Sequence, residues 1–209
     1  VSHSVRAGAD AQRNVASSHD QLPHVVAIGG GTGLPNVLRG LRPLLCGSPD
    51  VPPDVCRDRL IAIVATSDDG GSSGKLRAEF NVIPPGDIRN CLAALSDNHS
   101  RIADIFQYRF DSGEGLNGHA IGNLVLTALA DVTNDFPRAV EIAGRVVGAR
   151  GTVVPATSEL VAVVAEFEDG RVLSGETAIA GAGGRILGVG LLPDRPRCGP
   201  IVGATGGSA

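Results

Sequence analysis

The chain has 209 residues, of which 43% are hydrophobic and only 3% are aromatic. This length suits one domain of ordinary size, and its core must consist mainly of Val, Ile, Leu and Ala. Such a core favours buried parallel strands covered by helices over an aromatic-rich sandwich or barrel. The net charge is −4 and the sequence has no long Lys/Arg run, which argues against nucleic acid as a partner.

The cysteines and the apolar segments indicate where the protein resides. The four cysteines show no C-x-x-C spacing, so we expect reduced, mostly structural thiols rather than a disulfide framework or a zinc site. No apolar stretch approaches the ~20 residues that span a bilayer, and the N-terminus lacks a signal pattern. We therefore expect a cytoplasmic protein that does not insert into membranes.

A βαβ unit is predicted in the first third of the chain. Residues 1–22 are small and polar without periodicity, which predicts a disordered tail. The apolar segment 24–28 then runs directly into "GGGTG", and leucines at helical spacing follow from Leu34 to Leu45. A Pro-rich connection leads to a second buried-type strand over 60–66. Strand, glycine loop, helix and strand together predict a parallel sheet of Rossmann-like α/β type, flanked by helices.

Helices are predicted to dominate the middle of the chain. Asp87 begins a helix that carries Ile88, Cys91, Leu92 and Leu95 on one face, and a further helix carries Ile102, Ile105 and Phe106. After a glycine-rich loop over 111–118, a further helix is expected to bury a stripe of apolar side chains. That stripe consists of Ile121, Leu124, Val125, Ala128 and Leu129. Asp135 caps the next helix, with Pro137 in its first turn.

From Gly151 onward the pattern changes to strands. "TVVPA" and "ELVAVVAEFE" are strand-like, and a turn at Asp169-Gly170 joins the latter to "RVLSGETAI", which predicts a β-hairpin region after residue 151. The Gly- and Pro-rich end suggests no clear element. We therefore divide the chain into a tail over 1–22, one α/β domain over 23–193 and an irregular tail over 194–209.

The loop Gly29-Gly30-Gly31-Thr32-Gly33 is the first candidate binding element. Glycines allow positive φ and a close approach of the backbone, and the N–H groups at the start of the following helix suit a phosphate or diphosphate. The spacing matches neither the dinucleotide fingerprint, whose third glycine would fall on Leu34, nor a P-loop. A tight turn without ligand is the alternative.

The second candidate is "ATSDDGGSSGKLR", residues 65–77, directly after the second strand. In a doubly wound sheet, ligands lie beyond the carboxyl ends of the strands, so Asp68 and Asp69 are expected beside the glycine loop. Two carboxylates there can hold Mg²⁺ at a diphosphate, or one can accept hydrogen bonds from a ribose. Ser72 and Ser73 offer hydroxyl donors to phosphate oxygens. The alternative is an Asx-turn and helix cap.

Two further segments carry polar residues that can complete a pocket. In "PPGDIRN", Asp87 is either a helix cap or a ligand-binding residue, and Arg89 and Asn90 lie off the apolar stripe. In "GLNGHAIGN", His119 and Asn123 are four residues apart on one expected helix face, where they form either a binding surface or a solvated polar face. Zinc is not expected, because no matching ligand set is present.

Five segments in this order resemble the bacterial gluconeogenesis factor (YvcK) family, which is related to the 2-phospho-L-lactate transferases (CofD). They are "VVAIGGGTGLPNVLRGLR", "IAIVATSDDGGSSGKLR", "VIPPGDIRNCLAALS", "FQYRFDSGEGLNGHAIGNLVLTAL" and "GTVVPAT". The resemblance covers about residues 23–193. It implies a Rossmann-type protein that binds a nucleoside diphosphate compound at its strand ends.

The resemblance also implies a function, and the wording of the motifs favours the gluconeogenesis-factor branch. That branch is regarded as a UDP-sugar-binding regulator of cell shape and cell-wall precursor flux on gluconeogenic carbon. Regulatory protein partners and a homodimer are consistent with that role. Catalysis is less expected; the alternative is a Mg²⁺-dependent phospholactyl-type transferase with the metal on Asp68 and Asp69. A nicotinamide oxidoreductase is a weaker hypothesis, because the glycine loop does not match the dinucleotide-binding fingerprint.

We therefore predict one nucleotide-sugar site, with no catalytic residue assigned. Its expected residues are Gly30, Gly31, Thr32, Gly33, Asp68, Asp69, Ser72, Ser73, Asp87, Arg89, Asn90, His119 and Asn123. Members of the family continue beyond the point where this sequence departs from them, so we expect this chain to be truncated at its C-terminus.

Overall fold

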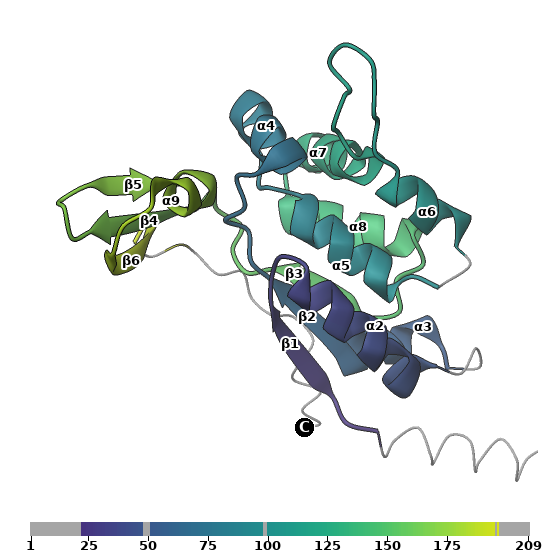
Figure 1. Ribbon diagram of the computed structural model, residues 1–209. Coiled ribbons are helices and arrows are strands. Elements are labelled where there is room, and N and C mark those ends of the chain that lie inside the picture. The colour runs from purple at the N-terminus through teal and green to yellow at the C-terminus, as the bar shows by residue number, and fades with distance from the viewer. Residues whose placement is uncertain (1–21, 48–50, 98–99, 195, 197–209) are drawn as a thin grey trace, which may run out of the picture.

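The computed structural model describes residues 22–47, 51–97, 100–194 and 196. The tails predicted over 1–22 and 194–209 lie almost wholly outside the described residues. Strands and helices alternate in the first part of the chain, helices follow, and strands return at the end (Figure 1). The elements are β1 (Val25–Gly29), α2 (Gly33–Cys46), α3 (Pro53–Arg59), β2 (Leu60–Val64), α4 (Gly71–Phe80), α5 (Gly86–Leu95), α6 (Arg101–Gln107), α7 (Ile121–Thr133), α8 (Phe136–Val146), β3 (Thr152–Pro155), β4 (Ala162–Phe167), β5 (Val172–Ser174), α9 (Glu176–Ala182) and β6 (Ile186–Leu192).

The central sheet is parallel, as predicted, with the strand order β1-β2-β3. Val25 pairs with Leu60, and Ile61 pairs with Thr152, so the carboxyl ends of β1 and β2 lie side by side. The helices α2, α5 and α8 pack on one face of the sheet (Figure 1). On the opposite face, Val26 and Ile28 are 51% and 77% exposed. The Rossmann-like α/β class is confirmed.

The hydrophobic core lies between this sheet and its helices. Leu38 of α2, Val64 of β2 and Leu92 of α5 are almost fully buried, and small or branched aliphatic side chains make up most of the cluster. The low aromatic content is therefore compatible with a packed interior. Burying one such side chain contributes about 1.5–3 kcal/mol. The buried cysteines Cys46, Cys56 and Cys91 are free thiols, as expected; Cys198 lies outside the described residues.

The predicted buried stripe of α7 needs correction, because the tertiary packing turns this helix differently. On α7 the buried residues are Gly122, Asn123, Leu126 and Thr127, whereas Ala128 is exposed and the rest of the predicted stripe is half-buried. On α6 only Ala103 and Phe106 are buried. The apolar residues of α7 lie on all sides of the helix, so periodicity alone did not identify the side that packs against the fold. The Pro-rich connection also contains a helix, α3, because proline is tolerated in a first helical turn.

A second, antiparallel sheet projects from the carboxyl-end side of the parallel one (Figure 1). Its strand order is β5-β4-β6, which confirms the predicted hairpin of β4 and β5. The prediction was wrong beyond Ser174, where the chain turns through Gly175 into α9 instead of continuing as a strand. The apparently irregular segment that follows forms β6, which pairs with β4. We call β4, β5, α9 and β6 the hairpin module.

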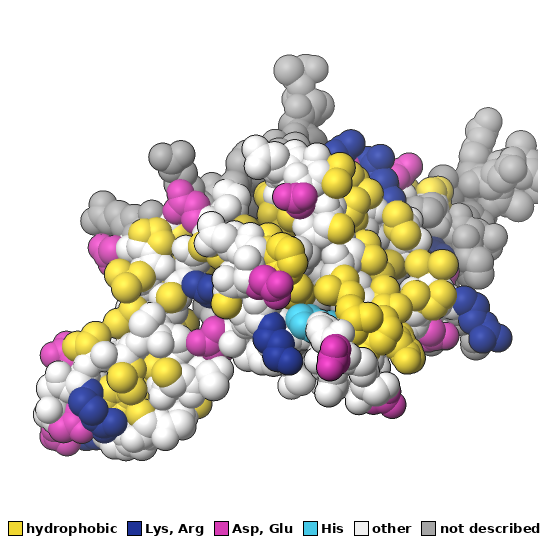
Figure 2. Space-filling model, turned by 90° about the horizontal axis from the view of Figure 1, so that it is seen from above, with side chains coloured by type: hydrophobic (Ala, Val, Ile, Leu, Met, Phe, Trp, Pro, Cys, Tyr) yellow, Lys and Arg dark blue, Asp and Glu magenta, His cyan; other side chains and the backbone are white. Residues whose placement is uncertain are grey.

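No helix in the described part of the chain is long and apolar enough to cross a membrane. On the face drawn in Figure 2, the coloured Lys and Arg side chains are scattered among acidic and apolar ones rather than gathered in one patch.

Candidate functional site

The glycine loop and the aspartate segment meet at the carboxyl ends of β1 and β2. The backbone N–H of Ala65 donates a 2.8 Å hydrogen bond to the carbonyl oxygen of Gly29, which ties the two loops together. Gly31 has φ of +59°, a conformation that favours glycine, and a Cβ at Gly31 or Gly33 would meet no heavy atom within 4 Å. The sequence prediction that these two loops lie together is confirmed, and open space borders the glycine loop.

The start of α2 leaves N–H groups for a ligand. Thr32 occupies the N-cap position without a side-chain hydrogen bond, and no acidic residue lies in the first turn. The N-terminus of this 14-residue helix therefore combines free backbone donors with a positive dipole end. Such an arrangement suits a phosphate group.

Asp87 approaches the same loop from α5. Its Oδ2 accepts a 2.5 Å hydrogen bond from the N–H of Gly31, so one loop donor has an internal partner. A Cβ at Gly30 would lie 2.9 Å from Asp87 Oδ2, which explains why this position lacks a side chain. Burial raises the pKa of Asp87, and the negative charges of Asp68 and Glu176 raise it further, against the effect of the Gly31 hydrogen bond. The mouth of the site is therefore acidic.

The two adjacent aspartates have different partners. Asp68 Oδ1 accepts a 2.9 Å hydrogen bond from the N–H of Gly70, and its Oδ2 lies 3.5 Å from the position of a Cβ on Gly86. Asp69 instead turns toward the hairpin module, where its Oδ1 accepts bonds from the N–H and hydroxyl of Thr177, at 2.9 and 2.7 Å. The structure thus places Asp68 next to Asp87, and Asp69 at the contact with α9.

The electrostatics of Asp69 agree with a carboxylate that stays charged. Burial alone would raise the pKa of Asp69, but the hydrogen bonds from Thr177 outweigh it and the pKa is lowered, with help from the charge of Arg77. A neighbouring hydrogen bond joins the Ser67 hydroxyl to Glu176 Oε1. Two side-chain contacts therefore fix the start of α9 against the segment after β2.

The two serines hold α4 in place. Ser73 Oγ accepts a 3.1 Å hydrogen bond from the N–H of Gly86 at the start of α5. Ser72 Oγ lies 3.1 Å from His119 Nδ1 and accepts a 3.0 Å bond from Asn123 Nδ2. His119 and Asn123 are only 6% and 1% exposed, so the solvated-face alternative is wrong.

His119 also borders a cavity of about 550 Å³ beside α4. Its other lining residues are Lys75, Ala78, Glu79, Gly115 and Asn117. The Lys75 ammonium lies 3.5 Å from the carbonyl oxygen of Asn117, so the glycine-rich loop over 111–118 reaches α4. His119 precedes α7 rather than lying within it, because the helix begins at Ile121.

Arg89 and Asn90 lie on α5, away from the glycine loop. Arg89 Nη2 donates a 2.8 Å hydrogen bond to Asn90 Oδ1, and Gln107 Nε2 approaches the same oxygen at 3.5 Å. Arg89 is 5% exposed. Burial lowers the pKa of Arg89 to about 10, and the like charge of Arg109 adds to this effect. The predicted residues therefore fall into an acidic mouth, a buried Ser72–His119–Asn123 cluster and a basic region around Arg89.

Several residues of this region escaped the sequence analysis. Glu176 and Thr177 were assigned to a strand, although the alanines that follow them favour a helix. Thr66 was given no role in the site, yet it is buried two residues after β2 and its hydroxyl has no partner in the described structure. Arg109 lies within one of the five segments that resemble the family, but it was not assigned to the site.

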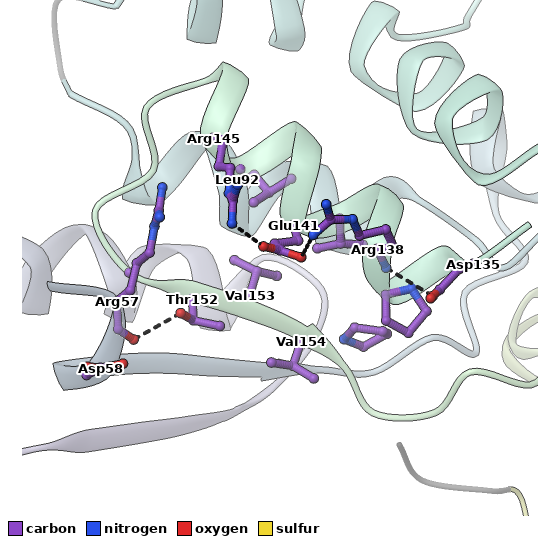
Figure 3. Close-up of a pocket in the computed structure, with 15 residues that line it drawn as sticks. Arg57, Asp58, Leu92, Asp135, Arg138, Glu141, Arg145, Thr152, Val153 and Val154 are labelled. Carbon is purple, nitrogen blue, oxygen red and sulfur yellow. Dashed lines mark hydrogen bonds and ion pairs between the residues drawn. The ribbon is translucent and has the colours of Figure 1, made fainter. Parts of the chain in front are cut away.

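A second cavity, of about 500 Å³, lies between β3 and α8 (Figure 3). None of the predicted site residues lines it. Arg138 and Arg145 both pair with Glu141 on the exposed side of α8, and Thr152 donates a 2.9 Å bond to the carbonyl oxygen of Arg57. Because these groups have partners within the fold, we assign no ligand to this cavity. Among the described residues, no group of three or more His, Cys, Asp or Glu is placed to hold a metal ion by itself.

The fold and the site define the class of protein: a Rossmann-like α/β protein with a glycine loop and an acidic mouth at its strand ends. The sequence profile of 2-phospho-L-lactate transferase CofD matches residues 25–204, and the chain belongs to this family. The relationship to the gluconeogenesis factors of the family, inferred from the motifs, is confirmed by the similarity to individual proteins.

The alignments to those relatives cover only about half of each relative's length. The chain is 47% identical over 175 residues to the gluconeogenesis factor of Bacillus subtilis, covering 84% of this chain and 51% of that protein. It is 45% identical to the gluconeogenesis factor of Listeria monocytogenes, covering 82% and 50%. A crystal structure of a UPF0052 family protein from Bacillus halodurans superposes with a TM-score of 0.71 at 39% identity, covering 83% and 52%. The chain therefore spans about half the length of the relatives it matches.

Proposed function

We propose that this chain binds a nucleoside diphosphate sugar, with UDP-sugars as the expected class. In this proposal it acts as a regulatory protein of the gluconeogenesis-factor type. The observation that carries the proposal is the open glycine loop, Gly30–Gly33, at the uncapped start of α2. Free N–H groups there suit the diphosphate. The similarity to gluconeogenesis factors supports a regulatory role.

The acidic mouth must accommodate a negatively charged diphosphate. Asp68, Asp87 and Glu176 would repel it, so we propose that Mg²⁺ lies between the diphosphate and the first two of these carboxylates. Mg²⁺ commonly uses one or two carboxylates together with phosphate oxygens and water. Asp69, predicted as a metal ligand, serves in this proposal to hold α9, because its Oδ1 accepts hydrogen bonds from the N–H and the hydroxyl of Thr177.

Titration calorimetry with UDP-N-acetylglucosamine, with and without Mg²⁺, tests the proposal. We expect Mg²⁺-dependent binding that weakens at least about tenfold in Asp68→Asn, equivalent to about 1.4 kcal/mol. Asp104→Asn, an exposed carboxylate in the first turn of α6, is the matched control and should bind normally. Unchanged affinity in Asp68→Asn, or no binding to the wild type, would overturn the site.

The regulatory role carries further expectations. We propose that the loaded protein acts on cell shape and cell-wall precursor supply through protein partners, and that it resides in the cytoplasm. The free buried thiols Cys46, Cys56 and Cys91 are compatible with that reducing compartment. A pull-down in which the amount of protein partner depends on added UDP-N-acetylglucosamine would support the role. An amount that is the same with and without the nucleotide sugar would count against it.

A phospholactyl-type transferase is the second candidate, favoured by the acidic mouth and the family match. Mg²⁺ at Asp68 would then stabilise the charge that develops on the leaving nucleotide. Mg²⁺-dependent release of nucleotide from a nucleoside diphospholactate in the presence of a deazaflavin would identify it. Binding without such turnover supports the regulator.

A further inference from the structure

Arg89 is a buried cation whose hydrogen-bonding capacity is mostly unused. Its Nε and Nη1 are buried without a hydrogen-bond partner in the described part of the chain; only Nη2 has one, Asn90 Oδ1. An unsatisfied buried donor costs free energy, and more so when it is charged. Such a group therefore points to an acceptor that the described fold does not itself supply.

The side chain of Arg89 lies against the first turn of α7. A Cβ on Gly122, the second residue of this helix, would be 2.8 Å from Arg89 Cγ and 2.6 Å from the ring of Phe106. The helices α5, α6 and α7 thus meet here at close range (Figure 1). The 13-residue α7 begins without a side-chain cap and without an acidic residue in its first turn. Its positive dipole end therefore lies near Arg89, with no acidic residue in its own first turn.

A second arginine, Arg109, lies near the start of α7. Arg109 pairs through its backbone with Ala120, the N-cap residue of α7, and its side chain donates to the carbonyl oxygen of Gly118. Its charge is close enough to lower the pKa of Arg89, after the larger effect of burial. Arg109 is exposed, so this side of the cluster is open to solvent.

Two nearby groups offset part of this positive charge. The carbonyl oxygen of Phe106, near the end of α6, is 2.6 Å from the same Cβ position on Gly122. The charge of Asp87 favours the charged form of Arg89. Neither group hydrogen-bonds to Arg89 Nε or Nη1. The lowered pKa of Arg89 shows that burial and Arg109 outweigh Asp87.

We propose that Arg89, Arg109 and the first turn of α7 form a binding site for an oxyanion, either a phosphate or a carboxylate group. Guanidinium groups bind both through paired, charge-assisted hydrogen bonds, and the helix start adds N–H donors. The inference rests on the proposed function, because Asp87 joins this oxyanion site to the acidic mouth along α5. It specifies a ligand with a second anionic group beyond its Mg²⁺-bound diphosphate.

Inorganic phosphate is the first probe, titrated by calorimetry into the full chain at constant ionic strength. Binding should weaken at least tenfold in Arg89→Gln and in Arg109→Gln, and stay unchanged in Arg101→Gln, which removes an exposed cation of α6. Arg109 is exposed, so Arg109→Gln remains informative even if Arg89→Gln fails to fold. No phosphate binding by the wild type, or equal binding by Arg109→Gln, overturns the oxyanion site.

UDP-glucuronate and UDP-glucose distinguish a carboxylate from other ligand groups. Tighter binding of UDP-glucuronate that is lost in Arg109→Gln assigns the site to a carboxylate, whereas phosphate binding without this preference assigns it to a phosphate. Asp68→Asn should weaken both nucleotide sugars and leave inorganic phosphate binding intact. If Asp68→Asn weakens them but Arg109→Gln changes neither phosphate nor nucleotide-sugar binding, the proposed function stands and the oxyanion site falls.

Discussion

Replacing Gly86 by alanine tests how the start of α5 is held beside the aspartate segment. A Cβ on residue 86 would lie 2.3 Å from Ser73 Oγ, about 1 Å inside van der Waals contact. To relieve the overlap, either Ser73 turns away and leaves the N–H of Gly86 without its acceptor, or α5 moves. A lost acceptor costs about 1–3 kcal/mol and overpacking costs a similar amount. We expect Gly86→Ala to lower the free energy of unfolding by about 2–3 kcal/mol.

The double mutant isolates the cause. In Ser73→Ala the hydroxyl is gone, and the remaining neighbours of a Cβ on residue 86 are Asp68 Oδ2 at 3.5 Å and the Cβ of residue 73 at 3.7 Å, which are ordinary contacts. Gly86→Ala should therefore cost less than about 0.5 kcal/mol in the Ser73→Ala background, a coupling of about 2 kcal/mol. Urea unfolding of the four proteins measures this coupling. Additive losses would refute the reasoning.

Three further changes test other contacts of the site. Asp87→Asn removes a carboxylate whose pKa is raised in the folded state. The wild type therefore loses stability as pH rises from 3.8 through that pKa, whereas the urea midpoint of the mutant should not fall over the same pH range. Asp69 has a lowered pKa, so its contribution to the free energy of unfolding is present at neutral pH and is lost as pH falls below 3.8. Asp69→Asn should therefore increase hydrogen exchange in α9 at pH 7, and Thr177→Val should do the same. Ser72→Ala removes the acceptor of a buried amide and the partner of His119, and should cost about 1–3 kcal/mol in urea unfolding; a loss below about 0.5 kcal/mol would show that the cluster is not a structural unit.

Much of the acidic mouth was predictable because it depends on short-range order. A buried strand followed at once by glycines, and another followed at once by aspartates, place both loops at one edge of a parallel sheet. The cap of Asp135 was likewise predictable, since Asp135 Oδ1 accepts from the N–H of Arg138 only three residues away. Such features need only the local chain and the direction of the strands.

The division of labour between Asp68 and Asp69 was not predictable in this way. Adjacent residues of the same type differ here because Thr177, 108 residues further along, reaches Asp69. The burial of His119 and Asn123 has a similar origin, since their partner Ser72 lies on another helix. Periodicity also misplaced the packed side of α7, where Gly122 lies close to Arg89 of α5 and Phe106 of α6, and Asn123 bonds to Ser72 of α4.

The sequence by itself determined the family, the parallel α/β core and the two loops that line its strand ends. The family follows from the resemblance of five ordered segments, whereas the core and the loops follow from apolar periodicity and from glycines and aspartates placed at strand boundaries, which are local properties. Only the tertiary structure decided that Asp69 fixes the hairpin module, that the Ser72 cluster is buried and that Arg89 lies against the start of α7. Those outcomes depend on which distant side chain arrives at each position, and no local pattern encodes the charge and space that it meets there.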